Sequence, residues 1–252
     1  MLKYIISTLF LIITFFSFAQ EKAQQKDTTA AVVVYKQKYG LRAGFDAGKI
    51  IRTLLDDNYK GFEINGDFRM SRMLYLAAEI GTEEKITNED FYSFKSSGNY
   101  IKAGVDINTY ENWYGMENLI YIGFRGATST FKHQINEYKI YNTNQYWGEG
   151  ELIGDNPELL NEGDSLNAIW LEVLVGLKAE IFNNVFIGGS IQLHYLVSEK
   201  VSDNFPNLYI PGFNKVTDGS KFGVGYNYTI TYLVPIFKKA KKKKEKEKQE
   251  EN

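Results

Sequence analysis

The 252-residue sequence contains no Cys, only two His and four Pro. The absence of Cys excludes a disulfide scaffold, a zinc–thiolate site and a thiol nucleophile. Two His leave little room for a histidine-rich metal site, and the composition excludes collagen, coiled coil and wholesale disorder. We therefore expect no cofactor and no metal ion.

Long apolar runs are also missing beyond the N-terminus. The longest uncharged apolar stretch after residue 19 is far below the ~18 residues that a spanning helix needs. The mean hydropathy of −0.32 is typical of a soluble protein. Membrane β-barrels, however, are polar at alternate positions and give no hydrophobic window, so this value does not exclude them.

The first 19 residues have the pattern of a secretory signal peptide. Lys3 supplies the positive charge, residues 4–16 are almost entirely apolar, and Ser17-Phe18-Ala19 offers small residues for cleavage before Gln20. An uncleaved N-terminal anchor helix is the alternative. The sequence therefore predicts export.

Both ends of the remaining chain are polar. Residues 20–38 are predicted to be a periplasmic linker, although a short strand at residues 30–35 stays open. Residues 238–252 hold eight Lys and four Glu, which predicts a solvated, disordered tail. Because the whole chain has a net charge of −2, residues 20–237 carry about −7. An acidic body argues against nucleic acid as a partner.

Residues 39–237 contain eight segments in which apolar and polar residues alternate. Successive side chains of a strand point to opposite faces, so each segment has one apolar face and one face of Gly, small polar and charged residues. The segments are residues 41–48, 62–69, 74–81, 100–107, 120–125, 169–181, 185–195 and 224–232.

Charges of both signs share the polar face. In an eight-stranded barrel the interior is just wide enough for side chains to fill it, so we expect a salt-bridge network that closes the lumen; a proton or ion path is the alternative. The predicted network consists of Arg42, Asp46, Glu63, Asp67, Arg69, Glu79, Lys102, Asp106, Arg125, Glu172, Lys178 and Glu180.

The connections alternate in length, which is typical of a barrel with short periplasmic turns and long extracellular loops. Short or moderate links are expected near Ser71-Arg72, at Thr109–Glu117 and at residues 182–184. Long links are expected at Arg52–Asn58, Thr82–Ser97, Thr128–Asn167 and Ser198–Ser220.

Four short stretches resemble small outer-membrane β-barrel proteins of Gram-negative bacteria. The chain is most similar to an uncharacterised secreted barrel family of Bacteroidota, a resemblance that implies no established activity and no catalytic residue. The stretches are Tyr39–Gly44, Tyr59–Glu63, Tyr100–Gly104 and Tyr110–Asn118.

The last segment resembles the C-terminal signal that the outer-membrane assembly machinery recognises. Gly225 is followed by Tyr228, Ile230 and Tyr232, with Phe237 near the end. The resemblance implies the assembly machinery as a partner during biogenesis. The Lys-rich tail that follows Phe237 departs from signals that close the chain.

Three functions are compatible with these patterns. A non-enzymatic outer-membrane protein would act through its loops in binding, adhesion or envelope integrity, with candidate contacts to an unknown extracellular ligand at Tyr138, Tyr141, Tyr146 and Trp147. A lipid-modifying enzyme would use a rim-sited His with a Ser, such as His194 with the nearby Ser198, and His133 is the other candidate His. A soluble lipocalin-like binder would need the reverse arrangement, an apolar lumen and a polar exterior.

We expect an eight-stranded, antiparallel, up-and-down transmembrane β-barrel in the cell outer membrane. Its termini are predicted to lie in the periplasm and its partner to be outer-membrane lipid. The oligomeric state is not predicted.

Overall fold

The computed structural model describes most of the predicted barrel. The predicted signal peptide, residues 20–35 of the linker, the tail after Ala240 and the candidate loop residues Tyr141, Tyr146 and Trp147 lie outside the described residues. Tyr138 lies in a strand, but its side chain is not among those described. The described residues are 36–89, 92–110, 117–140, 151–152, 165–201, 206–217 and 219–240.

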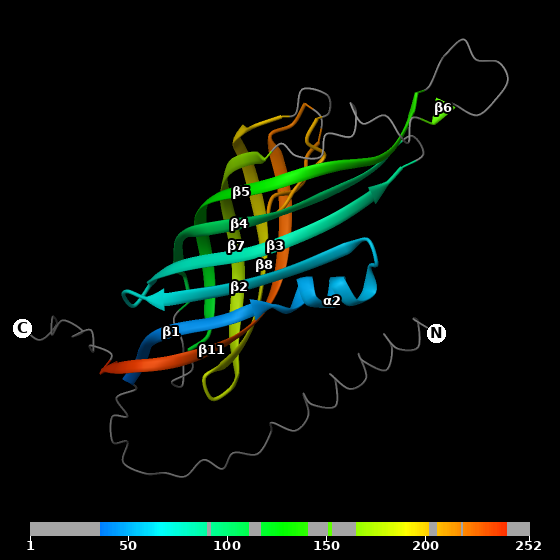
Figure 1. The fold of residues 1–252 in the computed structure, drawn as a ribbon. Coiled ribbons are helices and arrows are strands. Elements are labelled where there is room, and N and C mark those ends of the chain that lie inside the picture. Colours follow the sequence, from blue (N-terminus) through cyan, green and yellow to red (C-terminus); the bar gives the residue numbers. More distant parts are fainter. Residues whose placement is uncertain are drawn as a thin grey trace, which may run out of the picture. The chain divides into compact units, whose positions relative to one another are not determined.

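Eight long strands form one closed ring (Figure 1). Each strand pairs antiparallel with the next one along the chain, and the last pairs with the first. The eight-stranded up-and-down barrel predicted from alternation is thereby confirmed. The strands are β1 (Lys36–Asp46), β2 (Tyr59–Arg69), β3 (Leu74–Asn88), β4 (Tyr92–Asn108), β5 (Leu119–Ile140), β7 (Leu166–Phe182), β8 (Val185–Glu199) and β11 (Phe222–Ala240).

The two faces of the ring differ as the alternation requires. Outward side chains are apolar and exposed: Val175 is 57% and Ile191 73% exposed. Inward side chains are polar and buried: Glu63 is 1% and Arg125 5% exposed. The apolar surface therefore lies outside the ring, and the ionic groups lie inside it.

One expected loop is a paired hairpin. Residues Thr82–Ser97 were predicted to form a long link, but β3 and β4 stay paired from Thr82↔Asn99 to Asn88↔Ser93. The alternation ends there because outward Thr82 and Glu84 are polar, although the backbone remains extended. The same correction applies to the start of the predicted link at Thr128–Asn167, since β5 continues to Ile140. In Figure 1, β3, β4 and β5 accordingly project beyond the rest of the ring.

The predicted link Arg52–Asn58 contains the end of a helix, α2 (Ala47–Leu55). The side chain of Asp46 caps the helix by accepting bonds from the N–H of Gly48 at 2.8 Å and of Lys49 at 3.3 Å. Asp and other short polar residues favour this position because they satisfy the free N–H groups of the first turn. No helix in the described part of the chain is long and apolar enough to cross a membrane.

Helix α2 occupies the place of β1 in the wall. Strand β1 ends at Asp46, opposite Thr229, whereas β2 and β11 continue past that level. Beyond the end of β1, α2 packs on both β2 and β11. The hydroxyl of Thr53 accepts from the N–H of Gly61 in β2 at 2.9 Å, and the Asp46 carboxylate from the N–H of Tyr228 in β11 at 3.3 Å.

The connection between β8 and β11 folds into the ring. It contains two short strands, β9 (Tyr209–Ile210) and β10 (Asn214–Lys215), which form an antiparallel pair. We call residues Tyr209–Lys215 the inner hairpin. Ile210 and Phe213 are 0% and 1% exposed and pack in an apolar cluster with inward side chains of the barrel. A two-residue strand, β6 (Glu151–Leu152), pairs with the end of β5.

Candidate functional site

The predicted network residues all lie on the inward face or at its rim. Ten of the twelve are buried, while the side chains of Lys178 and Glu180 are 11% and 14% exposed. An unpaired charge in such a place would cost several kcal/mol. The partners of these groups therefore decide what the lumen can do.

Asp67 joins two cations near the end of the barrel at which β1 begins and β11 ends. Its carboxylate lies 2.7 Å from the guanidinium of Arg42 and 2.5 Å from the ammonium of Lys178. At the rim of the same end, Arg69 pairs with Glu117 at 2.7 Å and Glu180 pairs with Lys38 at 3.1 Å. These contacts link β1, β2 and β7 with the segment before β5.

A second group lies farther inside. Arg125 pairs with Asp106 at 2.7 Å and lies 3.5 Å from Glu79. Lys102 pairs with Glu172 at 2.9 Å and is 3.8 Å from Glu79. Two cations and three carboxylates from four strands thus neutralise most of one another's charge across the lumen.

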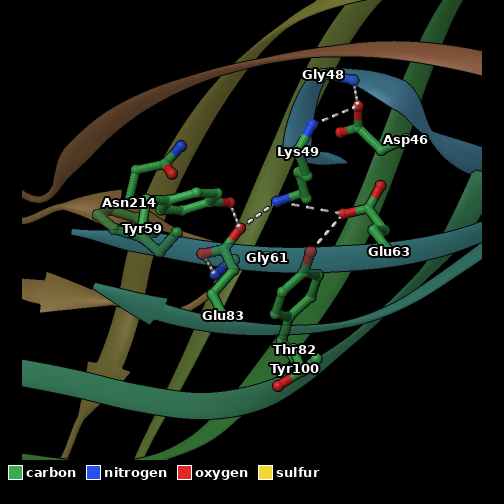
Figure 2. Close-up of polar contacts among 12 residues, drawn as sticks. Asp46, Gly48, Lys49, Tyr59, Gly61, Glu63, Thr82, Glu83, Tyr100 and Asn214 are labelled. Carbon is green, nitrogen blue, oxygen red and sulfur yellow. Dashed lines mark hydrogen bonds and ion pairs between the residues drawn. The ribbon is translucent and has the colours of Figure 1, made fainter. Parts of the chain in front are cut away.

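A third group surrounds Glu83, which sequence reasoning missed. Figure 2 shows Lys49 of α2 pointing into the barrel between Glu63 and Glu83. The ammonium of Lys49 forms an ion pair with Glu83 and lies 3.6 Å from Glu63. The hydroxyl of Tyr100 donates to Glu63 at 2.5 Å.

Glu83 also holds the inner hairpin. Its carboxylate accepts from the hydroxyl of Tyr59 at 3.1 Å, the hydroxyl of Tyr209 at 2.8 Å and the N–H of Gly212 at 2.9 Å. With Lys49, four donors satisfy one fully buried carboxylate. Glu83 had a signal in the sequence, because it continues the inward positions of Glu79 and Gly81 into the segment treated as a loop.

Asp46, a member of the predicted network, lies outside the ion pairs described above. Its carboxylate accepts backbone N–H bonds and caps α2, and it forms no ion pair within 4.0 Å with any described residue. Lys49, which the prediction did not include, supplies the positive charge at this level. The helical spacing of Ile50, Ile51, Leu54 and Leu55 is the signal that could have indicated α2.

Two groups outside the strands of the wall have displaced pKa values. Burial lowers the pKa of Lys49, but Glu83 and Glu63 outweigh it and raise the pKa above its ordinary value. Burial and the charge of Glu83 both raise the pKa of Tyr209 well above its ordinary value. Lys49 therefore stays charged and Tyr209 stays a hydroxyl donor over the physiological range.

Both histidines contact the inner hairpin. The Nδ1 of His194 lies 2.9 Å from the carbonyl oxygen of Phe213, and its Nε2 lies 3.2 Å from Gln192 Oε1 and 3.4 Å from Glu172. The Nε2 of His133 lies 3.2 Å from the carbonyl oxygen of Tyr209. Ser198 is exposed, and the hydrogen bonds of His194 are made to groups other than a serine. Both rings thus bind backbone carbonyl groups of the inner hairpin, and the hydrogen-bond partners of neither ring include a serine hydroxyl among the described residues.

Comparison with known proteins found a family and two solved structures. The family model described as "Domain of unknown function (DUF6048)" matches residues 1–239. None of the curated proteins compared with the chain matches it.

Two solved structures are similar to the chain at low sequence identity. The chain is similar to Ail, the attachment invasion locus protein of Yersinia pestis, at 11% identity and a TM-score of 0.38, over 79% of this chain and 98% of that one. It is similar to CarO of Acinetobacter baumannii at 11% identity and a TM-score of 0.33, over 78% and 98%. At these TM-scores the barrel assignment rests on the strand pairing described above. Because the family model spans nearly the whole sequence, the chain belongs to the family described as domain of unknown function DUF6048.

Proposed function

We propose that this protein is a non-enzymatic barrel of the outer membrane that acts through its extracellular loops. The observation that carries the proposal is the reversal of polarity across the wall. Exposed Val175 and Ile191 form part of an apolar outer surface, while Arg125 and Glu63 are enclosed. A soluble barrel has no reason to expose this surface to water, whereas a membrane barrel needs it.

The ends of the strands suggest the orientation. The β7–β8 turn at Asn183-Asn184 and the β2–β3 turn at residues 70–73 lie at the same end as Lys36 and Ala240. The projecting parts of β3, β4 and β5 lie at the opposite end. We place the short turns in the periplasm and the projecting hairpins outside the cell.

The same contacts support a closed lumen. The ion pairs of Asp67, Glu79 and Glu172 cross the ring, and the inner hairpin covers them from the outer side. Eight strands leave no open channel once side chains fill them. We therefore assign the lumen to stability and the task of binding, adhesion or envelope integrity to the loops, including the connection that carries Tyr141, Tyr146 and Trp147.

Two measurements test this proposal. Cell fractionation should place the protein in the detergent-extractable outer-membrane fraction, with an unboiled sample that migrates differently on a gel from a boiled one. Recovery in a soluble fraction contradicts the placement. Replacement of Tyr141, Tyr146 and Trp147 together by Ser, which leaves the paired strands unchanged, should abolish surface binding but keep the gel shift. Stable, large conductance in a planar bilayer contradicts the closed lumen.

A further inference from the structure

Three cations converge at the outer mouth, the opening of the barrel at the end that we place outside the cell. Arg52 belongs to α2, Lys85 to the projecting part of β3 and Lys215 to β10 of the inner hairpin. Lys85 takes an inward position, because its partners in the neighbouring strands are the buried residues Tyr59 and Ser96. The cluster therefore lies within the ring, away from the lipid that surrounds the wall.

Two tyrosine rings hold two of these cations beside one another. The guanidinium carbon of Arg52 lies 3.9 Å from the ring centroid of Tyr59. The ammonium of Lys85 lies 5.1 Å from the ring centroid of Tyr209. Both tyrosine hydroxyls donate to Glu83, so the two rings meet at one carboxylate. Because a cation is attracted to the face of an aromatic ring, these contacts fix Arg52 and Lys85 on either side of the mouth.

Lys215 completes the cluster from the inner hairpin. Its backbone pairs with that of Tyr209, whose ring carries Lys85. Burial lowers the pKa of Lys85, which lies beyond the apolar part of β3, and the positive charges of Arg52 and Lys215 lower it further. Neighbouring cations lower a pKa in this way only when they lie close enough to repel one another, so the three side chains share one region.

The neighbouring acids do not balance the charge of this cluster. Asp56 lies 3.7 Å from Arg52, and both side chains are partly exposed, at 39% and 34%. Glu83 already has Lys49 as its counter-ion. The two lysines of the cluster form no ion pair within 4.0 Å with any described residue. One carboxylate against three cations leaves a surplus of two positive charges at the outer mouth.

A phosphate monoester matches this surplus. It carries a charge of about −1.5 to −2 at pH 7 and three strong acceptor oxygens. The planar guanidinium of an arginine binds phosphate through two parallel hydrogen bonds, and a lysine adds a compact charge with three donors. Because the tyrosine rings already hold Arg52 and Lys85, these side chains lose less conformational entropy when an anion binds.

We propose that the outer mouth of the barrel binds the phosphate monoester group of a soluble molecule outside the cell. Arg52, Lys85 and Lys215 contact the phosphate oxygens from three different elements. The inference rests on the proposed function and its orientation of the barrel, and it gives the proposed binding role a class of ligand and a site.

Isothermal titration calorimetry of the full chain folded in detergent micelles tests the site. The probes are glucose 6-phosphate, inorganic phosphate and glucose, at one pH and one salt concentration. We expect glucose 6-phosphate to bind at least as tightly as inorganic phosphate, and glucose not to bind measurably, because the phosphate oxygens make the contacts. Absence of binding by glucose 6-phosphate, or equal binding of glucose, overturns the proposal. Inorganic phosphate that binds more tightly than the ester overturns the assignment to a monoester.

Variants assign the binding to the cluster. Lys215→Met removes an exposed charge, and Lys85→Met removes a half-buried one. Each should weaken the binding of glucose 6-phosphate about tenfold or more, because a hydrogen bond to a charged group is lost. Lys132→Met is the matched control, since Lys132 is exposed on the outward face of β5 at the same end of the barrel. An equal effect of K132M overturns the site.

The gel shift between unboiled and boiled samples checks the fold of each variant. Lys215 is exposed, so K215M decides alone if K85M does not fold, and an unchanged affinity of K215M contradicts the site. A wild-type protein that folds as a barrel and binds neither phosphate refutes only this inference. Recovery of the wild-type protein in a soluble cell fraction refutes the proposed function.

Discussion

Lys49 and Glu83 form an ion pair that joins α2 to β3 across 34 residues of sequence. Glu83 also accepts from Tyr209 and Gly212 of the inner hairpin. One carboxylate thus connects the helix that completes the wall, the strand behind it and the loop that covers the lumen. Breaking this contact should loosen all three elements together.

The first prediction concerns that ion pair. Lys49→Met leaves Glu83 and Glu63 buried without their cation, which should destabilise the barrel by about 3–5 kcal/mol. Urea unfolding followed by the gel shift measures the change. Lys60→Met is the control, because Lys60 is an exposed side chain 3.6 Å from Glu84 and such pairs contribute about 0–1 kcal/mol. Similar losses in the two variants would contradict the assigned role of Lys49.

The second prediction tests the charge of Arg125 separately from the volume of its side chain. Arg125→Met should destabilise the barrel by about 3–5 kcal/mol, because Asp106 and Glu79 lose a buried partner. Adding Asp106→Leu removes one orphaned charge and should recover part of the loss. A double-mutant cycle by urea unfolding gives the coupling. A double variant less stable than R125M would show that Asp106 matters for something other than this pair.

The third prediction tests how the inner hairpin is held. Phe213 packs edge-on against Trp170, with ring centroids 5.9 Å apart, and is 1% exposed. Phe213→Ala should cost about 3–5 kcal/mol and raise hydrogen exchange at the amides of Tyr209–Lys215 first. Phe222→Ala, at an exposed position, is the control. Unchanged protection of these amides would mean that the hydrogen bonds of Glu83 hold the inner hairpin without Phe213.

The fourth prediction tests which part of the barrel wall lies in the bilayer. Val175 faces outward in the apolar surface, and Val175→Lys should reduce the free energy of folding into lipid vesicles by about 2–4 kcal/mol if it lies near the midplane. Thr130, which faces outward on β5 where this surface turns polar, provides the control. Thr130→Lys should cost about 0–1 kcal/mol. Equal costs would contradict the proposed position of the bilayer.

Much of the fold was predictable from local patterning. A strand has a period of two, so apolar and polar positions in segments such as residues 169–181 and 185–195 assign a face to every side chain before any contact is known. Inward Glu172 and outward Val175 illustrate this result. The continuation of β3 beyond Gly81 was missed because outward Thr82 is polar, and a pattern of hydrophobicity cannot distinguish a polar strand from a loop.

The partners of the buried groups were not predictable in the same way. Asp46 belongs to the inward face, as expected, but it caps α2 instead of pairing with a cation. Helix α2 itself was hidden because its apolar residues are exposed on the outside of the barrel: Leu54 is 78% and Leu55 82% exposed. We searched the sequence for residues that face the barrel interior. A helix that buries no apolar residue there is easily taken for a loop.

Alternation by itself determined the number of long strands and which side chains share a face, because both follow from the two-residue period of an extended chain. The up-and-down order was predicted from the lengths of the connections. Only the tertiary structure decided that a helix completes the wall, that residues 209–215 turn inward and that Glu83 is their common acceptor. The contacts of Glu83 with the inner hairpin join residues more than 120 positions apart. They exist only after the ring has closed, and no local pattern encodes them.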